Sequence, residues 1–320
     1  MHSVSGQEQW TMFSKVTATW CSNCGSWGWT MFEDALDATE NENVLAWTLH
    51  YSGDLRNPTA EAIADNFNAF AQPRFYINND DIGVNSGNIS NKIDELTETV
   101  NLLNSFAPFA AVDANAVYDG YKIAGDTQIE FLDDSPGNYY LGVYLVKDHI
   151  INPQANQGSM ADHRFVLMDH FGDNIFGNMI VSPQGNAGDM FSENFTKDIE
   201  IDLLDVSDYY VVSVLWNQIT DGSYRVFNLD VAQVEYLASN VVDESILSNY
   251  KIWVADKSVN IVPQTDSEYA VEIMTIDGKL IHEQRASGEI NIPLSTINES
   301  ILITKISSEN KQASQRLFLK

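Results

Sequence analysis

The stretch Trp20-Cys21-Ser22-Asn23-Cys24 holds the only two cysteines of a 320-residue chain. It follows residues 13–19, which are rich in strand-forming side chains, and precedes residues 25–38, which predict a helix. A strand that delivers two thiols to the start of a helix places them beside free backbone N–H groups and the positive end of the helix dipole. Because that environment favours the thiolate, it lowers the pKa of a cysteine. The two intervening residues leave the second sulfur within reach of the first, so we expect a redox-competent pair.

The residues after the predicted helix continue an alternation of strands and helices. Residues 44–51 predict a buried strand. Asn57-Pro58 then favours the start of a helix, because Asn suits the N-cap and Pro suits the first turn. Ile63, Phe67 and Phe70 recur at helical spacing, so we expect them to form the apolar face of this helix.

A proline-led strand and a last helix complete this part of the chain. Gln72-Pro73 precedes residues 74–77, which predict a short strand. Residues 89–103 predict a helix whose apolar residues share one face. These residues are Ile89, Ile93, Leu96, Val100 and Leu103. Residues 1–106 therefore show the order strand, thiol helix, strand, helix, proline-led strand and helix.

This order and the Cys-x-x-Cys pair resemble those of the thioredoxin-like oxidoreductases, which have an α/β fold. The resemblance implies a cis-proline at Pro73, 49 positions after Cys24 and facing the cysteines. It implies that Cys21 attacks the disulfide of a protein or peptide substrate and that Cys24 resolves the mixed disulfide. It also implies that Trp20, Gln72 and Pro73 border the groove that holds the substrate.

Two departures from the thioredoxin pattern leave other interpretations of the cysteine pair open. Lys15 stands six residues before Cys21, where the family has a buried acid that helps to move protons. The thiol helix also lacks the proline that kinks it in many members. The pair could instead form an inert small-loop disulfide. It could also form half a zinc site, but the chain has no second Cys-x-x-Cys and no paired histidines to complete it, so we expect neither a metal nor a cofactor.

The composition is strongly acidic, with 45 Asp and Glu residues against 17 Lys and Arg residues, a net charge of −28 and a pI near 4.2. Such a chain repels phosphate backbones, so we expect no nucleic-acid partner. No apolar run approaches the roughly 18 residues that a membrane helix needs, so we expect no transmembrane segment. The first residues show no charged stretch followed by an apolar one, so we expect that a signal peptide has been removed from an exported protein.

Residues 107–248 differ in character, because short strand-like runs alternate with Asp, Asn, Gly and Pro. Predicted strands cover residues 139–146, 164–168, 209–216 and 224–229. Asp221-Gly222 lies between the last two and predicts a hairpin turn. Many short strands with regular turns indicate a β-sandwich.

Four stretches of this segment resemble the Omp28-related outer-membrane proteins of the Bacteroidetes group. They are YLVKDHII at 144–151, HRFVLM at 163–168, YVVSVLWN at 210–217 and VFNLDVAQV at 226–234. The resemblance implies a sandwich joined to a thioredoxin-like half, and it brings no assigned reaction. His149, His163 and His170 also lie here. Their spacing fits no standard metal site, so we expect them to be strand-edge or loop residues held by hydrogen bonds.

The last part of the chain, residues 249–320, predicts further short strands at 252–262, 269–276, 279–283, 289–292, 301–306 and 315–319. The stretches IDGK at 276–279, GEINIPLS at 288–295, ILITK at 301–305 and RLFLK at 316–320 resemble the C-terminal sorting domain of type IX secretion substrates. The usual Tyr-Pro-Asn-Pro opening is missing. The resemblance implies the type IX secretion machinery as a partner and a secreted or cell-surface, outer-membrane location. The alternative is a small β-sandwich used for packing or self-association.

Together these patterns predict a multi-domain protein: an α/β thioredoxin-like domain at 1–106, a β-sandwich at 107–248 and a small all-β sandwich at 249–320. Two functions are compatible with them. The first is a secreted or cell-surface thiol–disulfide oxidoreductase that acts through Cys21 and Cys24. The second is a non-enzymatic surface protein for adhesion or ligand binding, in which the thioredoxin-like part is a scaffold and the disulfide a staple.

Overall fold

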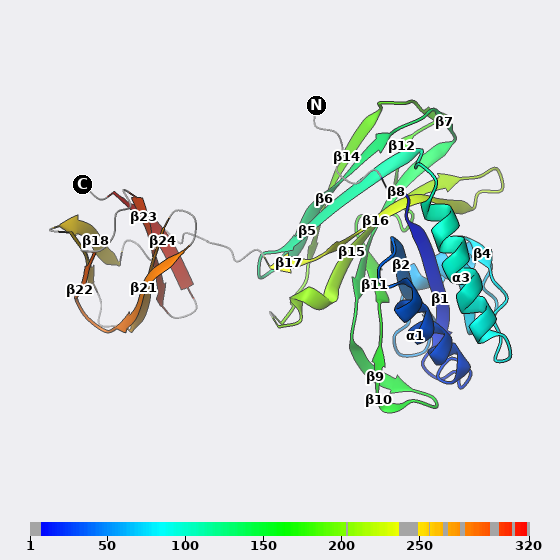
Figure 1. The fold of residues 1–320 in the computed structure, drawn as a ribbon, viewed down its shortest axis with the longest axis horizontal. Coiled ribbons are helices and arrows are strands. Elements are labelled where there is room, and N and C mark those ends of the chain that lie inside the picture. The colour runs from blue at the N-terminus through cyan, green and yellow to red at the C-terminus, as the bar shows by residue number, and fades with distance from the viewer. Residues whose placement is uncertain are drawn as a thin grey trace. The chain divides into compact units, whose positions relative to one another are not determined.

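The structure of the chain is a computed structural model that describes residues 8–202, 204–236, 249–255, 257–264, 268–275, 279–294, 301–308 and 311–318. The chain divides into two compact units, Met1–Leu237 and Ala238–Lys320 (Figure 1). Strands dominate both units, and the described residues contain three α-helices, all in the first unit. The protein is therefore β-rich, with several sheets spread over two units.

The first unit is built on a nine-stranded sheet in the order β16-β15-β8-β11-β2-β1-β3-β4, with β12 paired to β8. Its strands are β1 (Thr11–Ala18), β2 (Val44–Ser52), β3 (Arg74–Ile77), β4 (Asp80–Asp81), β8 (Asn138–Lys147), β11 (Val166–His170), β12 (Asn178–Val181), β15 (Tyr209–Gln218) and β16 (Tyr224–Gln233). Every residue of β1 is buried, because helices or other strands cover both faces of the sheet there. The parallel β1–β2 pair aligns Lys15 with Thr48 and Thr17 with His50.

This sheet runs from residues 1–106 into residues 107–248. β11 pairs in parallel with β2 through Val166 and Thr48, and it pairs antiparallel with β8. The backbone N–H of Thr48 also donates to the carbonyl of Phe165 at 2.8 Å. The two segments that the sequence predicts as separate domains therefore share one sheet and belong to one compact unit.

The helices of the first unit cover both faces of the sheet around β1 (Figure 1). They are α1 (Trp27–Thr39), α2 (Pro58–Asn66) and α3 (Ile89–Asn104). Successive residues of a strand point to opposite faces. Phe13 accordingly packs with Phe75 and with α1 and α3, whereas Met12 and Trp47 share a core with α2. The order of elements predicted for residues 11–104 is confirmed.

The predicted start of α2 is confirmed by its cap. The side-chain oxygen of Asn57 accepts a hydrogen bond from the N–H of Ala60 at 2.9 Å, and Pro58 opens the helix. This bond satisfies one of the free donors at the helix start. The same Asn57 donates through its side-chain nitrogen to the Leu167 carbonyl at 2.8 Å, which ties the cap to β11.

The prediction that Phe70 belongs to the apolar face of α2 is wrong. Ile63 and Phe67 are buried as predicted, but the helix ends at Asn66. Asn68 then takes a φ of 57°, in the left-handed region, and turns the chain away from the helix axis. Phe70 is consequently 87% exposed, although it keeps the helical spacing in sequence.

A second sheet faces one side of the first and encloses a separate core. Its order is β14-β6-β5-β17. Its strands are β5 (Ala110–Tyr118), β6 (Lys122–Phe131), β14 (Met190–Asp198) and β17 (Glu235–Tyr236). Phe131, Tyr139 and Leu215 are among the residues of the core between the sheets. The predicted hairpin at Asp221-Gly222 is confirmed, because β15 and β16 pair antiparallel around it and Gly222 has a φ of 88°.

Smaller elements complete the first unit. They are the pair β7 (Ser135–Pro136) and β13 (Gln184–Gly185), the pair β9 (Ile150–Gln154) and β10 (Gly158–His163), and the short helix η1 (Val206–Asp208). β9 and β10 form an antiparallel hairpin that aligns Ile151 with Asp162 and Ile150 with His163. This hairpin reaches the cysteine pair, as described below.

The second unit contains two sheets around one core. Their orders are β18-β19-β22 and β21-β20-β23-β24. The strands are β18 (Tyr250–Ala255), β19 (Ser258–Pro263), β20 (Tyr269–Thr275), β21 (Leu280–Ala286), β22 (Ile290–Pro293), β23 (Ile301–Ser308) and β24 (Lys311–Phe318). The core includes Val259, Ile273 and Leu302.

One strand prediction in this unit is wrong. Residues 252–262 do not form a single strand, because the chain reverses between Ala255 and Ser258, which are paired neighbours of β18 and β19. Lys257 in this turn has a φ of 55°. The first three residues of the IDGK stretch at 276–279, Ser295 and the last two residues of the chain lie outside the described residues.

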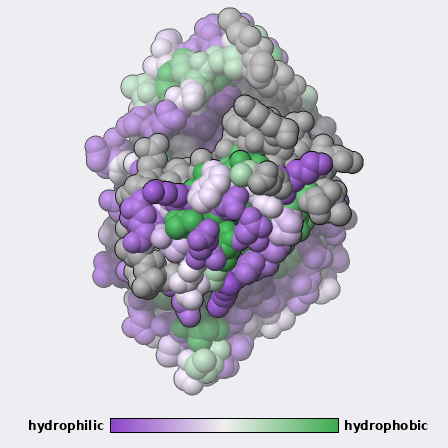
Figure 2. Space-filling view, turned by 90° about the vertical axis from the view of Figure 1, so that its left-hand side faces the viewer, coloured by the Kyte–Doolittle hydropathy of each residue, from purple (hydrophilic) through white to green (hydrophobic). Residues whose placement is uncertain are grey.

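On the face drawn in Figure 2, hydrophilic side chains predominate and hydrophobic ones form separate smaller areas. In the ranges that the structure describes, no helix has the length and apolarity needed to cross a bilayer.

Candidate redox site

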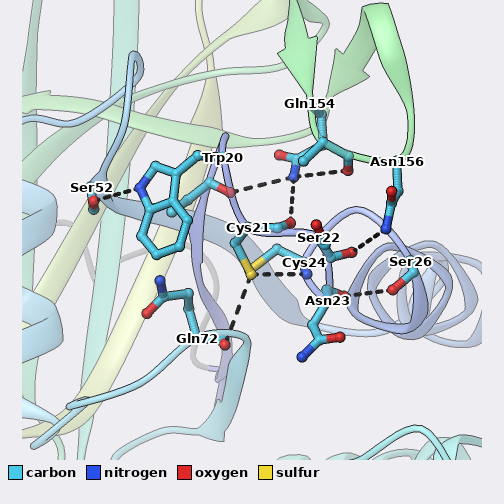
Figure 3. Close-up of a disulfide and its surroundings, with 12 residues drawn as sticks. Trp20, Cys21, Ser22, Asn23, Cys24, Ser26, Ser52, Gln72, Gln154 and Asn156 are labelled. Atoms are coloured by element: carbon cyan, nitrogen blue, oxygen red, sulfur yellow. Dashed lines mark hydrogen bonds between the residues drawn. A yellow bond between two sulfur atoms is a disulfide. The ribbon is translucent and has the colours of Figure 1, made fainter.

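Cys21 and Cys24 form a disulfide between the end of β1 and the start of α1 (Figure 3). Their Cα atoms are 5.2 Å apart. The chain turns here because the N–H of Cys21 donates to the carbonyl of Ala18, and the N–H of Gly25 donates to the carbonyl of Cys21, both at 3.2 Å. The helix begins at Trp27, later than the sequence predicts, so both cysteines precede its first turn.

The two sulfur-bearing residues differ in access. Cys21 is 6% exposed and Cys24 is fully buried. Cys21 is thus the more exposed of the two, although only a small part of it contacts solvent. The backbone N–H of Cys24 donates to the Sγ of Cys21 at 3.1 Å. In the reduced protein, this donor would stabilise a thiolate on Cys21.

The Gln72–Pro73 peptide is cis, as the thioredoxin resemblance implies, and it lies beside the disulfide. The carbonyl oxygen of Gln72 is 3.9 Å from the Sγ of Cys21. A side chain at Gly28 would place its Cβ only 2.7 Å from the ring of Pro73, so the close packing of α1 on this proline requires glycine. The side-chain oxygen of Gln72 accepts a hydrogen bond from the hydroxyl of Tyr51 at 2.5 Å.

One exposed aromatic side chain, Trp20, lies beside the disulfide. Trp20 is 60% exposed, and its indole N–H donates to the Ser52 hydroxyl at 2.9 Å. Figure 3 shows Trp20 and Gln72 on one side of Cys21. The exposed Phe70 stands two residues before Gln72. The structure therefore brings Trp20, Cys21 and Gln72 together.

The opposite side of the disulfide loop is covered by the tip of the β9–β10 hairpin. Gln154 donates through its side-chain nitrogen to the carbonyl of Cys21 at 3.0 Å, and Asn156 donates to the carbonyl of Ser22 at 3.0 Å (Figure 3). Sequence reasoning missed these residues, because more than 130 positions separate them from the cysteines and no motif connects the two segments.

Three basic side chains form a cluster that is buried between α1 and the sheet. Lys15, His50 and His163 are each no more than 4% exposed. The Lys15 Nζ lies 5.1 Å from the ring centre of Trp29 and 5.3 Å from that of Phe32. The His163 ring lies 5.4 Å from that of Trp29 and 5.1 Å from that of His50. Neither ring nitrogen of His50 has a hydrogen-bond partner among the described residues.

Burial disfavours the charged form of each group in this cluster. It lowers the pKa of Lys15 to about 7, and the nearby carboxylate of Glu33 offsets only part of this effect. Burial and the charge of Lys15 lower the pKa of His163 to about 4. Burial, with smaller contributions from His163 and Lys15, lowers the pKa of His50 well below its usual value. A cationic form of any of these groups would lose its hydration in the core.

Acidic residues at the edge of the cluster are paired. The buried Asp148 accepts two hydrogen bonds from Arg164, at 2.7 and 2.8 Å. His149 forms a 2.7 Å hydrogen bond with Asp162. Burial raises the pKa of Glu33, although Arg164 and Lys15 oppose this shift.

The three histidines singled out in the sequence are hydrogen-bonded, as predicted. His163 donates to the Asn152 carbonyl at 3.2 Å, His170 bonds to the Thr59 hydroxyl at 2.8 Å, and His149 is paired as described above. His163 is nevertheless a core residue rather than a loop residue. Within the described part of the chain, no group of three or more His, Cys, Asp or Glu residues is arranged to hold a metal ion.

Comparisons with known proteins show a similar fold, and they do not identify an activity. No protein-family model matches the chain, and no curated protein matches it. Among solved structures, HBP35 of Porphyromonas gingivalis aligns over 98% of this chain and 99% of its own, with a TM-score of 0.56 and 14% sequence identity. Spo0M, a sporulation control protein of Bacillus subtilis, aligns over 65% of this chain and 89% of its own, with 13% identity and a TM-score of 0.25, which is too low to indicate a shared fold. At 14% identity, the likeness to HBP35 shows a shared fold alone.

Proposed function

We propose that the protein is a thioredoxin-like thiol–disulfide oxidoreductase that acts through Cys21 and Cys24. The observation that carries this proposal is the placement of the Cys21–Cys24 disulfide directly before α1 and beside the cis Gln72–Pro73 bond. The exposed Trp20 and the half-buried Gln72 lie on the same side and offer a surface for a substrate chain. The opposite side is closed by the hairpin, so a partner approaches Cys21 from the Trp20 side.

The chemistry follows from this geometry. In the reduced protein, the Cys21 thiolate attacks one sulfur of a substrate disulfide, and the other substrate sulfur leaves as a thiolate. The Cys24 thiolate then attacks the Cys21 sulfur of the mixed disulfide. This step restores the Cys21–Cys24 disulfide, releases the second substrate thiolate and completes the transfer of two electrons to the substrate. The buried Cys24 reaches no external disulfide, so it serves only to resolve.

The test is reduction of a polypeptide disulfide, with insulin as the probe and dithiothreitol as the electron source. The wild-type chain should accelerate the reaction, and Cys21→Ser should abolish the acceleration. Cys24→Ser, reduced beforehand and then freed of dithiothreitol, should instead form a covalent protein–insulin species that mass spectrometry detects. Acceleration that persists in Cys21→Ser would refute the proposal.

A second function is favoured by the burial of the pair. Cys24 is fully buried and Cys21 is 6% exposed, and the disulfide loop is bound by the hairpin from another part of the chain. These features also suit a structural staple in a surface protein for adhesion or ligand binding. The two functions differ in the behaviour of the folded chain: a staple resists reduction until the protein unfolds, whereas a redox pair exchanges with thiols in the native state.

We further propose that residues 107–248 form an Omp28-related sandwich and residues 249–320 a type IX sorting domain, alongside the thioredoxin-like residues 1–106. The β-rich second unit and the fold shared with a protein of Porphyromonas gingivalis, a member of the Bacteroidetes, support export to the cell surface. A reporter fused to residues 249–320 tests the sorting role. It should reach the outside of a Bacteroidetes cell with type IX secretion, and it should stay inside an isogenic strain that lacks this system.

A further inference from the structure

The tip of the β9–β10 hairpin binds the backbone of the disulfide loop through four consecutive residues. Each donates one hydrogen bond to a different carbonyl of the loop. The bonds run from Gln154 to Cys21 at 3.0 Å, from the backbone of Ala155 to Thr19 at 2.9 Å, from Asn156 to Ser22 at 3.0 Å and from Gln157 to Gly25 at 2.9 Å. The hairpin thus contacts the loop before, within and after the cysteine pair.

The fit between hairpin and loop is close. A Cβ at Gly25 would lie 1.8 Å from the carbonyl oxygen of Ala155 and 3.0 Å from the side chain of Gln154. Only glycine allows this approach, so the sequence of the loop itself accommodates the hairpin. Gln154 is 4% exposed, and its side-chain nitrogen also lies 3.4 Å from the carbonyl of Ala18, at the end of β1.

The hairpin has one inner and one outer face. Gln154, Ala161 and His163 are buried, whereas Ile151 and Met160 are exposed. His163 anchors the inner face, because its ring contacts both α1 and β2 as described above. The base of the hairpin is therefore anchored to α1 and β2, which flank the cysteine-bearing segment.

We infer that the hairpin tip sets the reduction potential of the cysteine pair, with Gln154 as the main positioning residue. This inference rests on the proposed function. A loop whose carbonyls are bound from outside keeps its backbone conformation when the disulfide is reduced. The two sulfurs then remain near bonding distance, and their high effective concentration favours re-formation of the disulfide over the dithiol. The hydrogen bond from the Cys24 N–H to the Cys21 sulfur favours the reduced form, but it is a single bond, so we expect the positional effect to dominate.

The test is the equilibrium between the full-length chain and glutathione, in which the protein disulfide and two reduced glutathiones give the protein dithiol and one oxidised glutathione. Gln154→Ala should make the disulfide easier to reduce by about tenfold in the equilibrium constant, which for two electrons corresponds to a potential about 30 mV less negative. Asn156→Ala, at an exposed position, should shift it in the same direction by a smaller factor. Met160→Ala is the matched control on the outer face of the same hairpin, and it should leave the equilibrium unchanged.

A purely structural role for the hairpin would show a different pattern. In that case, Gln154→Ala would lower the free energy of unfolding of the oxidised chain and leave the glutathione equilibrium as in the wild type. If Gln154→Ala does not fold, the test rests on Asn156→Ala. A glutathione equilibrium constant in that variant equal to that of the wild type would overturn the inference. If the wild-type disulfide resists glutathione altogether, the proposed function fails. In that case, dithiothreitol should still reduce the disulfide faster in folded Asn156→Ala than in the folded wild type. Equal rates would overturn the role of the hairpin.

Discussion

The ring of His50 lies against the ring of His163, with their centres 5.1 Å apart, inside the layer between α1 and the central sheet. His50 comes from β2 and His163 from β10, so the pair joins the cysteine-bearing segment to the hairpin of the sandwich segment. Lys15 adds a third buried basic group to the same layer. Among the residues that the structure describes, no buried carboxylate is bonded to these three basic groups. Their charged forms are therefore costly in the core, and this cost makes stability depend on pH.

The histidine pair predicts a loss of stability in acid. Burial lowers the pKa of His163 to about 4 and moves that of His50 in the same direction. Between about pH 6.5 and pH 4, the unfolded chain therefore binds more protons than the folded one, and the free energy of unfolding falls as the pH falls. Urea titrations of the oxidised chain at pH 7.5 and pH 5 should show this fall, and His50→Leu should reduce it. His170→Leu, which changes a half-buried histidine, is the control. A fall of equal size in wild type and His50→Leu would exclude His50 as its source.

The buried Lys15 predicts that the free energy of unfolding also depends on pH in the alkaline range, between about pH 7 and pH 10.5. Its pKa is lowered by burial from 10.5 to about 7, so protonation favours the unfolded chain between these values. The penalty is fully present below about pH 7 and disappears as the pH rises toward 10.5. Lys15→Met keeps the length of the side chain and removes the amine. We expect it to raise the free energy of unfolding at pH 7 by a few kcal/mol. The gain should shrink steadily up to pH 10.

The control for Lys15→Met is Lys122→Met, because Lys122 is exposed on β6. That change should alter the free energy of unfolding by less than about 0.5 kcal/mol, with no trend between pH 7 and pH 10. If Lys15→Met destabilises the chain at pH 7, the buried lysine is held by an interaction stronger than its desolvation cost.

Trp20 predicts a difference between large and small substrates. It is 60% exposed beside Cys21, so its removal should cost little stability. Trp20→Ala should lower kcat/KM for insulin by about tenfold, since a buried aromatic contact contributes on the order of 1–3 kcal/mol. Reduction of a small aromatic disulfide should change by less than about twofold, because such a probe needs no chain-binding surface. Tyr121→Ala removes an aromatic residue that is 82% exposed in the sandwich, and it should affect neither substrate.

Much of the arrangement around the cysteines follows from local sequence, because each element carries its own signal. Asn57-Pro58 predicts the start of α2, and runs of strand-forming side chains predict β1 and β2. These signals act over a few residues, so they survive without knowledge of the rest of the chain. Phe70 shows the limit of periodicity: it has the right spacing, but the helix had already ended.

The part of the site that sequence reasoning missed depends on long-range contacts. Nothing near Gln154 indicates that its side chain binds the carbonyl of Cys21, because the contact depends on β11 pairing with β2 and bringing the sandwich segment alongside. The same pairing joins residues 1–106 and 107–248 in one sheet. Sequence reasoning missed His50 for a related reason. A lone histidine in an apolar strand indicates no function by itself, and its neighbour His163 comes from a distant segment of the chain.

Gly28 gives a prediction that opposes helix propensity. It lies within α1, where alanine normally stabilises a helix by about 1 kcal/mol relative to glycine. Here the added Cβ would approach the Pro73 ring to 2.7 Å and the Asn23 carbonyl to 3.1 Å. Overpacking of this kind costs about 1–3 kcal/mol, so Gly28→Ala should lower the free energy of unfolding rather than raise it.

Gly288→Ala is the matched control, because no atom lies within 4 Å of the Cβ that it would add. That change should leave the urea midpoint of the second unit nearly unchanged. Gly28→Ala should also slow insulin reduction, since α1 and Pro73 can relax only by moving apart and widening the gap between Cys21 and Gln72. A Gly28→Ala chain that is more stable than wild type would mean that Pro73 yields without cost. The packing of α1 on this proline would then not be what holds the cysteine loop against Gln72.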